Sequence, residues 1–387
     1  MPRLCPICKA AKKTKLYHQN FHNKVIALME NYDVVVCDNC GFVYADNIPS
    51  QEEFNKYYAK MSKYEFDFKD GVVASDYREH FEKIVNFLKP YLPDKRVGIL
   101  DIGCSTGALL NVLKLEGYFN LLGLDPSLAC VKTVKKLYGL EAKAGNIFDF
   151  KTDRQFGVII LSAVLEHLVN FKVALKKIRS WLVDGGLLFV EVPDAERFDG
   201  YIFTPFQQFS IEHLNYFSQS SLKNLLGKFA FETMALEKNE NRVNQTIDPD
   251  ILCLSEKQDK SDFKIVKDDA CQLRIKKYIA QCSQLDLKVK KIIRERLSDK
   301  NKIIVWGVGT HTQRLIGAGL DLSKILFFVD SNSRYHGKKL NGLEIKSPAD
   351  IKEGAPILIS TYSYQEEVIR QIRDGLKLKN EIVKIYE

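Results

Sequence analysis

The stretch VGILDIGCSTGALLNVLKLEGYFNLLGLD, residues 97–125, limits what this chain can fold into more than any other segment. An apolar run leads into a turn that carries Gly103 and Gly107, and apolar residues then recur at helical spacing from about Ala108. A second apolar run ends at Asp125. A strand, a glycine turn, a helix and a further strand, in this order, predict a βαβ unit with a parallel sheet.

The same stretch carries the residue types of a nucleotide-binding turn. Gly103 and Gly107 permit tight turning and a close approach of the backbone to a ligand. Asp125 lies 22 residues after Gly103, at the end of the second strand, where a carboxylate can accept hydrogen bonds from both ribose hydroxyls. An acidic residue, Asp101, also belongs to the turn. We therefore expect these four residues to bind a nucleotide-type cofactor.

This turn resembles motif I of the class I S-adenosylmethionine (SAM)-dependent methyltransferases, D-x-G-x-G-x-G, with Ser105 in place of the middle glycine. The order of motifs over residues 78–235 is similar to that family: AKAGNIFDF, the strand FGVIILS, the turn LEHL, a helix, a DGG turn and a fifth strand. The resemblance implies a Rossmann-like SAM-binding domain in which Asn146 and Ile147 contact the adenine. We also count Ser162, at the end of FGVIILS, among the expected cofactor-binding residues.

Two C-x-x-C pairs lie near the N-terminus, Cys5 with Cys8 and Cys37 with Cys40. Four thiolates suit a tetrahedral zinc ion and leave no position open for catalysis, so we expect a structural site. A redox role is disfavoured, because a thioredoxin-like pair lies between a strand and a helix of a βαβ unit. The segments DVVV and GFVY, on either side of the second pair, predict two strands that turn there.

The segment IEHLNYF places Glu212 and His213 beside aromatic residues, and FSQSSL after it predicts a helix cap followed by a helix. A carboxylate next to an imidazole can act as a general-base pair, because the carboxylate orients and stabilises the charged ring. A packing and hydrogen-bonding pair beneath a loop is the alternative interpretation. His167, in the LEHL turn, either takes a direct part in catalysis or only begins a helix.

A second βαβ pattern begins at NKIIVWGVGTHT and continues to KILFFVD, which ends at Asp330. The third glycine of a dinucleotide fingerprint is absent, so that signal is weak. The turn from Gly307 to Gly309 has backbone amides that suit a phosphate. A docking domain whose turn binds nothing is the alternative.

The order of zinc pairs, SAM domain, E-H-x-x-Y-F and a further α/β domain resembles the zinc-bearing sugar methyltransferases over nearly the whole chain. Members of that family methylate nucleotide-linked sugars. The resemblance implies catalytic roles for Glu212, His213, His167 and Tyr64, the last in MSKYEF. It also implies zinc ligation by the four cysteines, and a C-terminal domain that holds the nucleotide of the substrate at Gly307 and Gly309.

Two differences from the carbon-methylating members keep both O- and C-methylation open. Those members have a tyrosine two residues before the Glu-His pair, where this chain has Ser210. They also carry a Gly-Gly-Ser stretch before the last domain, and this chain reads NENRVNQTIDPDILCLSEK there. The resemblance therefore leaves open which atom of the sugar is methylated.

The predicted fold class is α/β, in four parts. A zinc-binding module takes residues 1–65 and a SAM-dependent methyltransferase domain takes 66–237. A connecting loop and helix follow over 238–300, where SEKQDKSDFK is polar enough for a mobile loop and QLRIKKYIAQCSQLDLKVKKIIRERL has helical spacing. A smaller α/β domain takes 301–387.

Composition narrows the partners only a little. The net charge of +8 comes from scattered lysines, and it favours anionic partners weakly. An RNA methyltransferase with an N-terminal zinc module is the main alternative function, although no clustered basic and aromatic residues support nucleic-acid binding. A non-catalytic SAM- or nucleotide-binding module is a third. No run reaches the roughly 20 apolar residues of a membrane span, and the N-terminus lacks an export signal, so we expect a cytoplasmic protein. The oligomeric state stays open.

Overall fold

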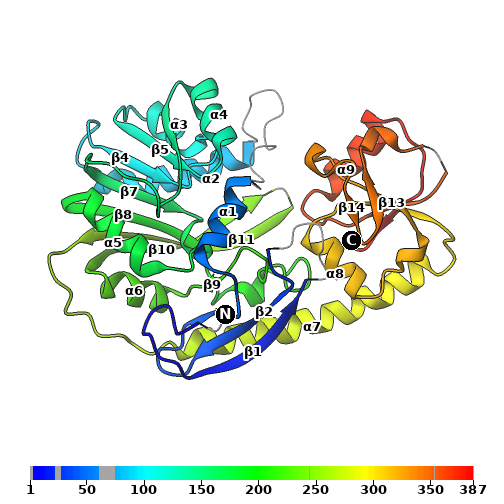
Figure 1. The fold of residues 1–387 in the computed structure, drawn as a ribbon, viewed down its shortest axis with the longest axis horizontal. Helices are drawn as coiled ribbons and strands as arrows, with labels where there is room; N and C mark the ends of the chain where they lie inside the picture. The colour runs from blue at the N-terminus through cyan, green and yellow to red at the C-terminus, as the bar shows by residue number, and fades with distance from the viewer. Residues whose placement is uncertain (1–2, 22–27, 61–74, 244, 353, 387) are drawn as a thin grey trace.

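The computed structural model describes residues 3–21, 28–60, 75–243, 245–352 and 354–386. The described residues form three sheets, of four, seven and six strands (Figure 1). Tyr64 lies outside the described residues, so its expected role stays a prediction.

The smallest sheet holds the paired cysteines. Strands β1 (Lys13–Asn20), β2 (Asn31–Cys37) and β3 (Val43–Asp46) form an antiparallel meander, and the predicted strands beside the second cysteine pair are confirmed. The fourth strand, β9 (Asn215–Tyr216), comes from far along the chain and pairs antiparallel with β3. Helix α1 (Gln51–Lys60) follows the meander. The N-terminal sheet is therefore completed by residues of the central region.

The central sheet has the strand order β10-β11-β8-β7-β4-β5-β6. Five of its strands are parallel: β4 (Ile99–Ile102), β5 (Leu121–Asp125), β6 (Glu141–Ala144), β7 (Phe156–Ser162) and β8 (Leu182–Pro193). The connecting helices are α2 (Ser75–Leu88), α3 (Ala108–Leu115), α4 (Leu128–Tyr138), α5 (Phe171–Trp181) and α6 (Gln219–Lys228). The predicted strand, turn, helix and strand over 97–125 are confirmed.

Both faces of this sheet are covered, which explains why its central strands read as continuous apolar runs. On one face, Ile84 of α2 and Leu109 of α3 pack against the sheet in one hydrophobic cluster. On the other face, Leu175 of α5 and Leu222 of α6 share a cluster with Cys5 and other residues of the N-terminal sheet. The cysteine-bearing module therefore packs into the core of the central domain.

The structure differs from the sequence prediction between residues 238 and 257. This segment was expected to begin a connecting loop, but β10 (Phe231–Val243) and β11 (Thr246–Lys257) form a long antiparallel hairpin, and β11 pairs with β8. Charged side chains are common on edge strands because they discourage pairing with other chains, so the polarity of β10 suggested a linker. The expected mobile loop begins inside β11, and beyond it Val266 exchanges two hydrogen bonds with Asn224 of α6.

The predicted connecting helix is confirmed as α7 (Asp269–Leu297), which runs along the base of the molecule to the C-terminal domain (Figure 1). That domain has the sheet order β14-β15-β13-β12-β16-β17. Its strands are β12 (Ile303–Trp306), β13 (Ile325–Val329), β14 (Lys339–Leu340), β15 (Leu343–Lys346), β16 (Ile357–Ile359) and β17 (Ile382–Lys384). Helices α8 (Thr310–Gly317) and α9 (Gln365–Arg370) follow β12 and β16. Among the described helices, none is both long enough and apolar enough to cross a membrane.

Candidate active site

A pocket lies at the carboxyl ends of the central parallel strands. Successive connections leave β4 toward β5 on one side, while β7 lies on its other side, and ligands of open α/β sheets bind where the strand order reverses in this way. The pocket encloses about 900 Å³, counting space that is open to solvent. Its lining comprises Gln51, Asn55, Tyr58, Ile102, Gly103, Leu124, Asp125, Pro126, Gly145, Asn146, Ile147, Phe148, Ala163, Val164, His167, Leu168 and Glu212.

One half of the pocket is built from the expected cofactor-binding residues. Gly103, Asp125, Asn146 and Ile147 all line it. Gly103 has φ +80°, and a Cβ there would lie 2.5 Å from Cγ2 of Val164, so glycine is required on both counts. The side chain of Val164 therefore packs directly against the backbone of this turn.

The acidic residues of this half sit in unusual electrostatic surroundings. The carboxylate of Asp125 accepts hydrogen bonds from the backbone amides of Ser105 (2.9 Å) and Ser127 (2.8 Å). Burial still raises the pKa of Asp125 to about 6. Burial and the charge of Asp125 together raise the pKa of Asp101 to about 7. A cationic ligand beside the two carboxyls would relieve this repulsion.

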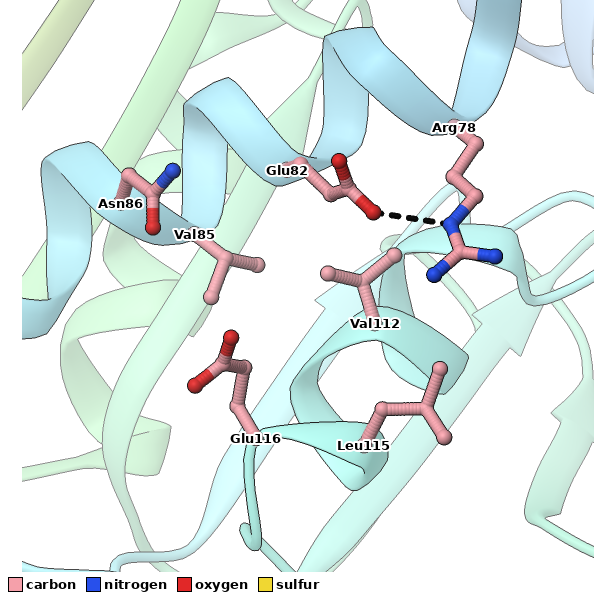
Figure 2. A pocket seen from close by; sticks show the side chains of 7 residues that line it. All are labelled: Arg78, Glu82, Val85, Asn86, Val112, Leu115 and Glu116. Carbon is pink, nitrogen blue, oxygen red and sulfur yellow. Dashed lines mark hydrogen bonds and ion pairs between the residues drawn. The ribbon is translucent and has the colours of Figure 1, made fainter. Parts of the chain in front are cut away.

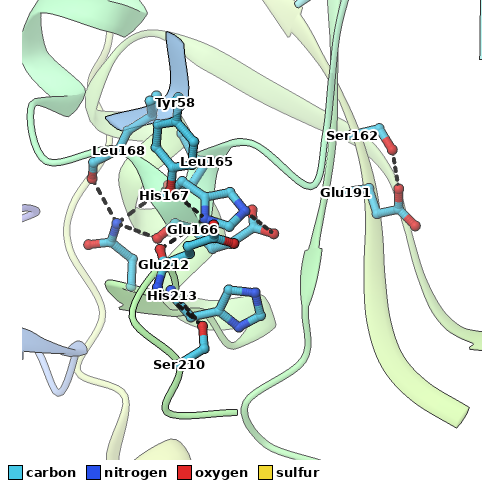
Figure 3. Close-up of polar contacts among 11 residues, drawn as sticks. Tyr58, Ser162, Leu165, Glu166, His167, Leu168, Glu191, Ser210, Glu212 and His213 are labelled. Carbon is cyan, nitrogen blue, oxygen red and sulfur yellow. Dashed lines mark hydrogen bonds and ion pairs between the residues drawn. The ribbon is translucent and has the colours of Figure 1, made fainter. Parts of the chain in front are cut away.

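Asp101, Gly107 and Ser162 do not line the pocket. Gly107 has φ +86° and begins α3, with Val134 3.0 Å from the position of a Cβ. The Ser162 hydroxyl donates to the buried carboxylate of Glu191, which also lies 3.1 Å from Nε2 of His80. Figure 3 shows this Ser162–Glu191 pair apart from the histidine cluster. A direct cofactor contact from Ser162 stays a prediction.

The other half of the pocket brings together two of the expected catalytic residues. Nδ1 of His167 donates to the backbone oxygen of Glu212 (2.9 Å) and lies 3.2 Å from the Tyr58 hydroxyl (Figure 3). The Tyr57 hydroxyl donates to Oε1 of Glu212 (3.0 Å). Residues that are 45 positions apart in the chain therefore share one wall of the pocket.

His213 completes this cluster. Its ring meets the His167 ring edge to face, with centroids 5.3 Å apart, and its backbone amide donates to the Ser210 hydroxyl (3.1 Å). His213 does not line the pocket itself, although it adjoins Glu212 and His167, which do. Ser210 thus orders the loop that carries the Glu-His pair.

Asn215 fixes the cluster to the N-terminal sheet. Its side-chain amide donates to the backbone oxygens of Glu166 (3.0 Å) and Leu168 (2.8 Å), and it approaches that of Leu165 (3.4 Å). Its oxygen lies 3.4 Å from Nη2 of Arg3. Asn215 is also one of the two residues of β9 that pair with β3, so the cysteine-bearing sheet directly supports the turn that carries His167.

The four N-terminal cysteines lie together but away from the pocket. Sγ of Cys5 lies 3.5 Å from Sγ of Cys40, and Sγ of Cys8 lies 3.4 Å from Sγ of Cys37. All four sulfur atoms lie within 4.8 Å of one another. Thiolates about 2.3 Å from a tetrahedral zinc ion are about 3.8 Å apart, so the donor set and its spacing fit zinc.

The turn of the C-terminal domain is not part of this pocket. Gly307 has φ +109°, and a Cβ there would lie 2.7 Å from the Ser360 hydroxyl. The backbone amide of Val308 donates to Asp330 (3.1 Å), and a Cβ at Gly309 would meet nothing within 4 Å. One link joins this domain to the pocket: after burial and Asp330, the charge of Glu212 also raises the pKa of Tyr335.

Residues 73–236 match the family model described as "Methyltransferase domain". This segment is a class I SAM-dependent methyltransferase domain. The expectation of such a domain, made from the motif order over 78–235, is therefore confirmed. A second model, described as "C2185-like, N-terminal", matches residues 299–383 and covers the C-terminal domain.

Two curated relatives cover part of the chain. The "Probable (S)-tetrahydroprotoberberine N-methyltransferase 2" of Papaver bracteatum is 26% identical over 127 residues, which is 28% of this chain and 36% of the relative. The "(S)-coclaurine N-methyltransferase" of Papaver somniferum is 31% identical over 101 residues, 24% of this chain and 28% of the relative. The chain thus spans about a third of the length of the curated relatives it matches.

One similar solved structure is the 1,6-didemethyltoxoflavin-N1-methyltransferase of Burkholderia thailandensis, with bound 1,6-didemethyltoxoflavin and S-adenosylhomocysteine. It is 12% identical, with a TM-score of 0.43, and the match covers 58% of this chain and 98% of that one.

The residues of α1 that face the methyltransferase domain were missed at the sequence level. Gln51, Asn55 and Tyr58 line the pocket, and Oε1 of Gln51 accepts hydrogen bonds from the amides of Val169 (2.8 Å) and Asn170 (3.1 Å). Their spacing of four and three residues places them on one helix face, which was the available signal. Only tertiary contacts show that this polar face meets the pocket.

A second hollow lies between α2 and α3, outside this site (Figure 2). Arg78 and Glu82 form an ion pair across one turn of α2 there (2.8 Å), and the exposed Leu115 forms part of its wall. Charges of both signs and an exposed wall are typical of an ordinary surface depression, so we assign it no function.

Proposed function

We propose that the chain is a SAM-dependent methyltransferase that methylates an oxygen or a carbon of a small, nucleotide-linked sugar. The observation that carries the proposal is the position of Glu212. This residue lines the pocket of the methyltransferase domain, and its charge acts on Tyr335 of the C-terminal domain. A sugar beside Glu212 would therefore lie next to the cofactor pocket, with Tyr335 of the C-terminal domain within the electrostatic reach of Glu212.

SAM, when bound, supplies an electrophilic methyl group in this pocket. The chain must therefore orient the acceptor and remove its proton. The carboxylate of Glu212 and the ring of His213 are the two bases on the acceptor side, and the Tyr57 hydroxyl holds Glu212 through its 3.0 Å hydrogen bond. Asp125, held by two backbone amides, is placed to accept hydrogen bonds from the cofactor ribose.

The nucleotide of the substrate is assigned to the C-terminal turn. Gly307 and Gly309 precede α8, whose first amides and dipole favour a phosphate. The turn lies where the strand order reverses between β12 and β16, which is where open α/β sheets bind ligands. The open space at Gly309 supports this assignment, because the backbone there is not covered by other residues.

The four cysteines hold a structural zinc ion on this proposal. Four thiolates leave no coordination position for substrate, and none of the four cysteines lines the pocket. Their contribution to activity is indirect, because β3 of the same module pairs with β9 beside the Glu-His pair.

The test is mass spectrometry of nucleotide sugars incubated with the full chain and SAM. The panel contains hydroxylated, 4-keto and amino sugars, and fragmentation locates the added methyl group. We expect gain on one hydroxylated or keto sugar, and loss of that gain in Glu212→Gln. Glu52→Gln is the matched control, because Glu52 is exposed on α1 and forms an ion pair with Lys56 of the same helix.

Two outcomes would contradict the proposal. Transfer to nitrogen alone would align the chain with the N-methyltransferases that it matches. SAM binding without methyl gain on any sugar, together with transfer to RNA, would replace the sugar with a nucleic acid.

A further inference from the structure

We propose that Glu166, His167 and His213 hold a divalent metal ion beside the methyl acceptor. The site is distinct from the four-cysteine cluster. It deepens the proposed function, because the ion would lie at the same acceptor end of the pocket.

The three side chains form a compact ligand set. One ligand atom of each lies within 4.8 Å of the others. Nε2 of His167 lies 3.6 Å from Oε1 of Glu166, which is too long for a hydrogen bond. Two ligand atoms that each lie about 2.1 Å from a tetrahedral ion are about 3.4 Å apart. The observed separation therefore fits two ligands on one ion better than a direct contact.

The tautomer of His167 also suits a ligand. Its Nδ1 faces the backbone oxygen of Glu212 at 2.9 Å, and a carbonyl oxygen can only accept. The proton of the neutral ring therefore lies on Nδ1, and the lone pair of Nε2 points toward Glu166. Histidines that bind metals commonly donate their second ring nitrogen to a backbone carbonyl in this way.

The ligands are held in place before any ion binds. The backbone oxygen of Glu166 accepts from the amide of Leu214 (3.0 Å) and from the side chain of Asn215 (3.0 Å). These bonds join the turn that carries Glu166 and His167 to the strand that follows His213 (Figure 3). A preorganised ligand set binds an ion without an added ordering cost.

The charge around the site favours a cation. Glu166 is 1% exposed, and a bound cation would lower the cost of keeping its carboxylate charged in this buried position. After burial, the charges of Glu191, Asp248 and Glu166 further raise the pKa of the buried Asp250. The negative charge of Glu166 therefore acts on a neighbouring buried carboxyl, and a cation bound at Glu166 would reduce that repulsion.

Two imidazoles and one carboxylate select ions of intermediate softness, such as Mn²⁺, Fe²⁺, Co²⁺ or Zn²⁺. Three protein ligands leave coordination positions open for an oxygen of the acceptor. A hydroxyl bound there would have a lower pKa, its O–H bond would break, and the proton would pass to the carboxylate of Glu212. Both histidines then act as ligands and Glu212 is left as the base.

Mn²⁺ is the probe that separates this site from the cysteines, because thiolates favour softer ions. The full chain, with its cysteine site loaded with zinc, is titrated with Mn²⁺ and the free ion is followed by electron paramagnetic resonance. We expect about one Mn²⁺ per chain in the wild type, and binding at least ten-fold weaker in His167→Ala, His213→Ala and Glu166→Gln. His18→Ala is the control, because His18 of β1 pairs with Asp33 of β2, in the N-terminal sheet.

SAM affinity and the thermal midpoint, measured on each variant, show whether it is folded. Absence of Mn²⁺ binding in the wild type overturns the metal site, as does equal binding in folded His213→Ala. Methyl transfer that is unchanged after Mn²⁺ and similar ions are removed overturns the catalytic role of the ion and leaves the proposed function standing. Mn²⁺ binding that depends on the three residues supports the metal site even if no sugar is methylated. In that case the sugar is rejected as the acceptor.

Discussion

Two buried carboxyls, Asp125 in the pocket and Asp101 close to it, have raised pKa values. Asp125 has two amide donors, yet its pKa is raised to about 6, and that of Asp101 is raised to about 7. The pKa of each carboxyl is well above the usual value of about 3.9 for aspartate. Burial outweighs the hydrogen bonds here because neither group has a positive partner among the causes that set its pKa.

This arrangement predicts a pH dependence. Because folding raises both pKa values, the stability that these protonated groups contribute is complete below about pH 4 and is lost as pH rises through about 6 to 7. SAM carries positive charge, so its affinity should rise over the upper part of this window as the carboxyls ionise. Calorimetry from pH 5.5 to 8.5 measures the affinity and the released protons. An affinity that is flat with pH would contradict this, and Asp101→Asn should flatten the upper part.

The sequence predicted residues of the pocket where the pattern that identifies them lies within one short segment of the chain. The spacing from Gly103 to Asp125 belongs to one βαβ unit, and the structure places both residues in the pocket. The contact between His167 and Glu212 spans 45 positions, so sequence could name both residues but could not bring them together. Tyr57 was missed because its role depends on where α1 docks.

At the scale of elements, β9 joins the cysteine module to the acceptor side of the pocket. Asn215 is central to this connection. It is 2% exposed, and its side-chain amide donates to backbone oxygens of the turn before α5. Its pairing with Tyr44 of β3 was not predictable, because a two-residue strand carries no pattern of its own.

Asn215→Ala is expected to destabilise the fold by about 2–4 kcal/mol, because it leaves buried carbonyl oxygens without a donor. Turnover should fall further than SAM affinity, since the turn that moves carries His167. Denaturant unfolding and steady-state rates measure both effects, with the exposed Asn20→Ala as control. A variant with wild-type turnover would show that β9 does not position the cluster.

Gly41 tests the junction between the cysteine module and α7. It has φ +77°, and a Cβ there would lie 2.0 Å from the backbone oxygen of Asp268, which caps α7. Gly41→Ala is expected to cost more than about 3 kcal/mol, because backbone atoms must move apart. Gly139→Ala is the matched control, since Gly139 has φ +64° and open space around it, and should cost only about 1 kcal/mol. Equal unfolding free energies would refute the close contact.

The hairpin β10–β11 shows why one boundary was misplaced. The sequence of β11 contains the apolar run ILCL, and Leu252 and Leu254 pack in the core beneath α2. The neighbouring β10 is the edge strand of the sheet, and its charged residues masked the strand pattern. Edge strands are therefore where local composition misleads most.

At the scale of the whole molecule, a hydrogen bond, a cation–π contact and a ring stack join the C-terminal domain to the rest of the chain. Arg314 of α8 donates to Gln19 of β1 (2.7 Å) and lies over the ring of Phe206 (4.5 Å). The rings of Phe203 and Tyr362 stack with centroids 5.6 Å apart. Such contacts place the C-terminal domain against the other two, and no sequence pattern specifies them.

Loss of zinc from the four cysteines is expected to affect turnover in the pocket, although no cysteine lines it. Cys37→Ser should lower the thermal midpoint and turnover together, because the β3–β9 pairing loses its support, while SAM affinity stays within about three-fold of wild type. Zinc content, calorimetry and rates measured on one preparation check the three statements. A zinc-free variant with unchanged thermal midpoint would contradict the structural role.

Calorimetric titration of SAM into three proteins tests the division of the pocket most directly. Asp125→Ala should weaken SAM binding at least about ten-fold, equivalent to about 1.4 kcal/mol, because the proposed ribose acceptor is lost. Glu212→Gln should bind SAM within about three-fold of the wild type, since Glu212 lines the part of the pocket that we assign to the acceptor. Wild-type affinity in Asp125→Ala, or a comparable loss in Glu212→Gln, would contradict a SAM pocket divided in this way.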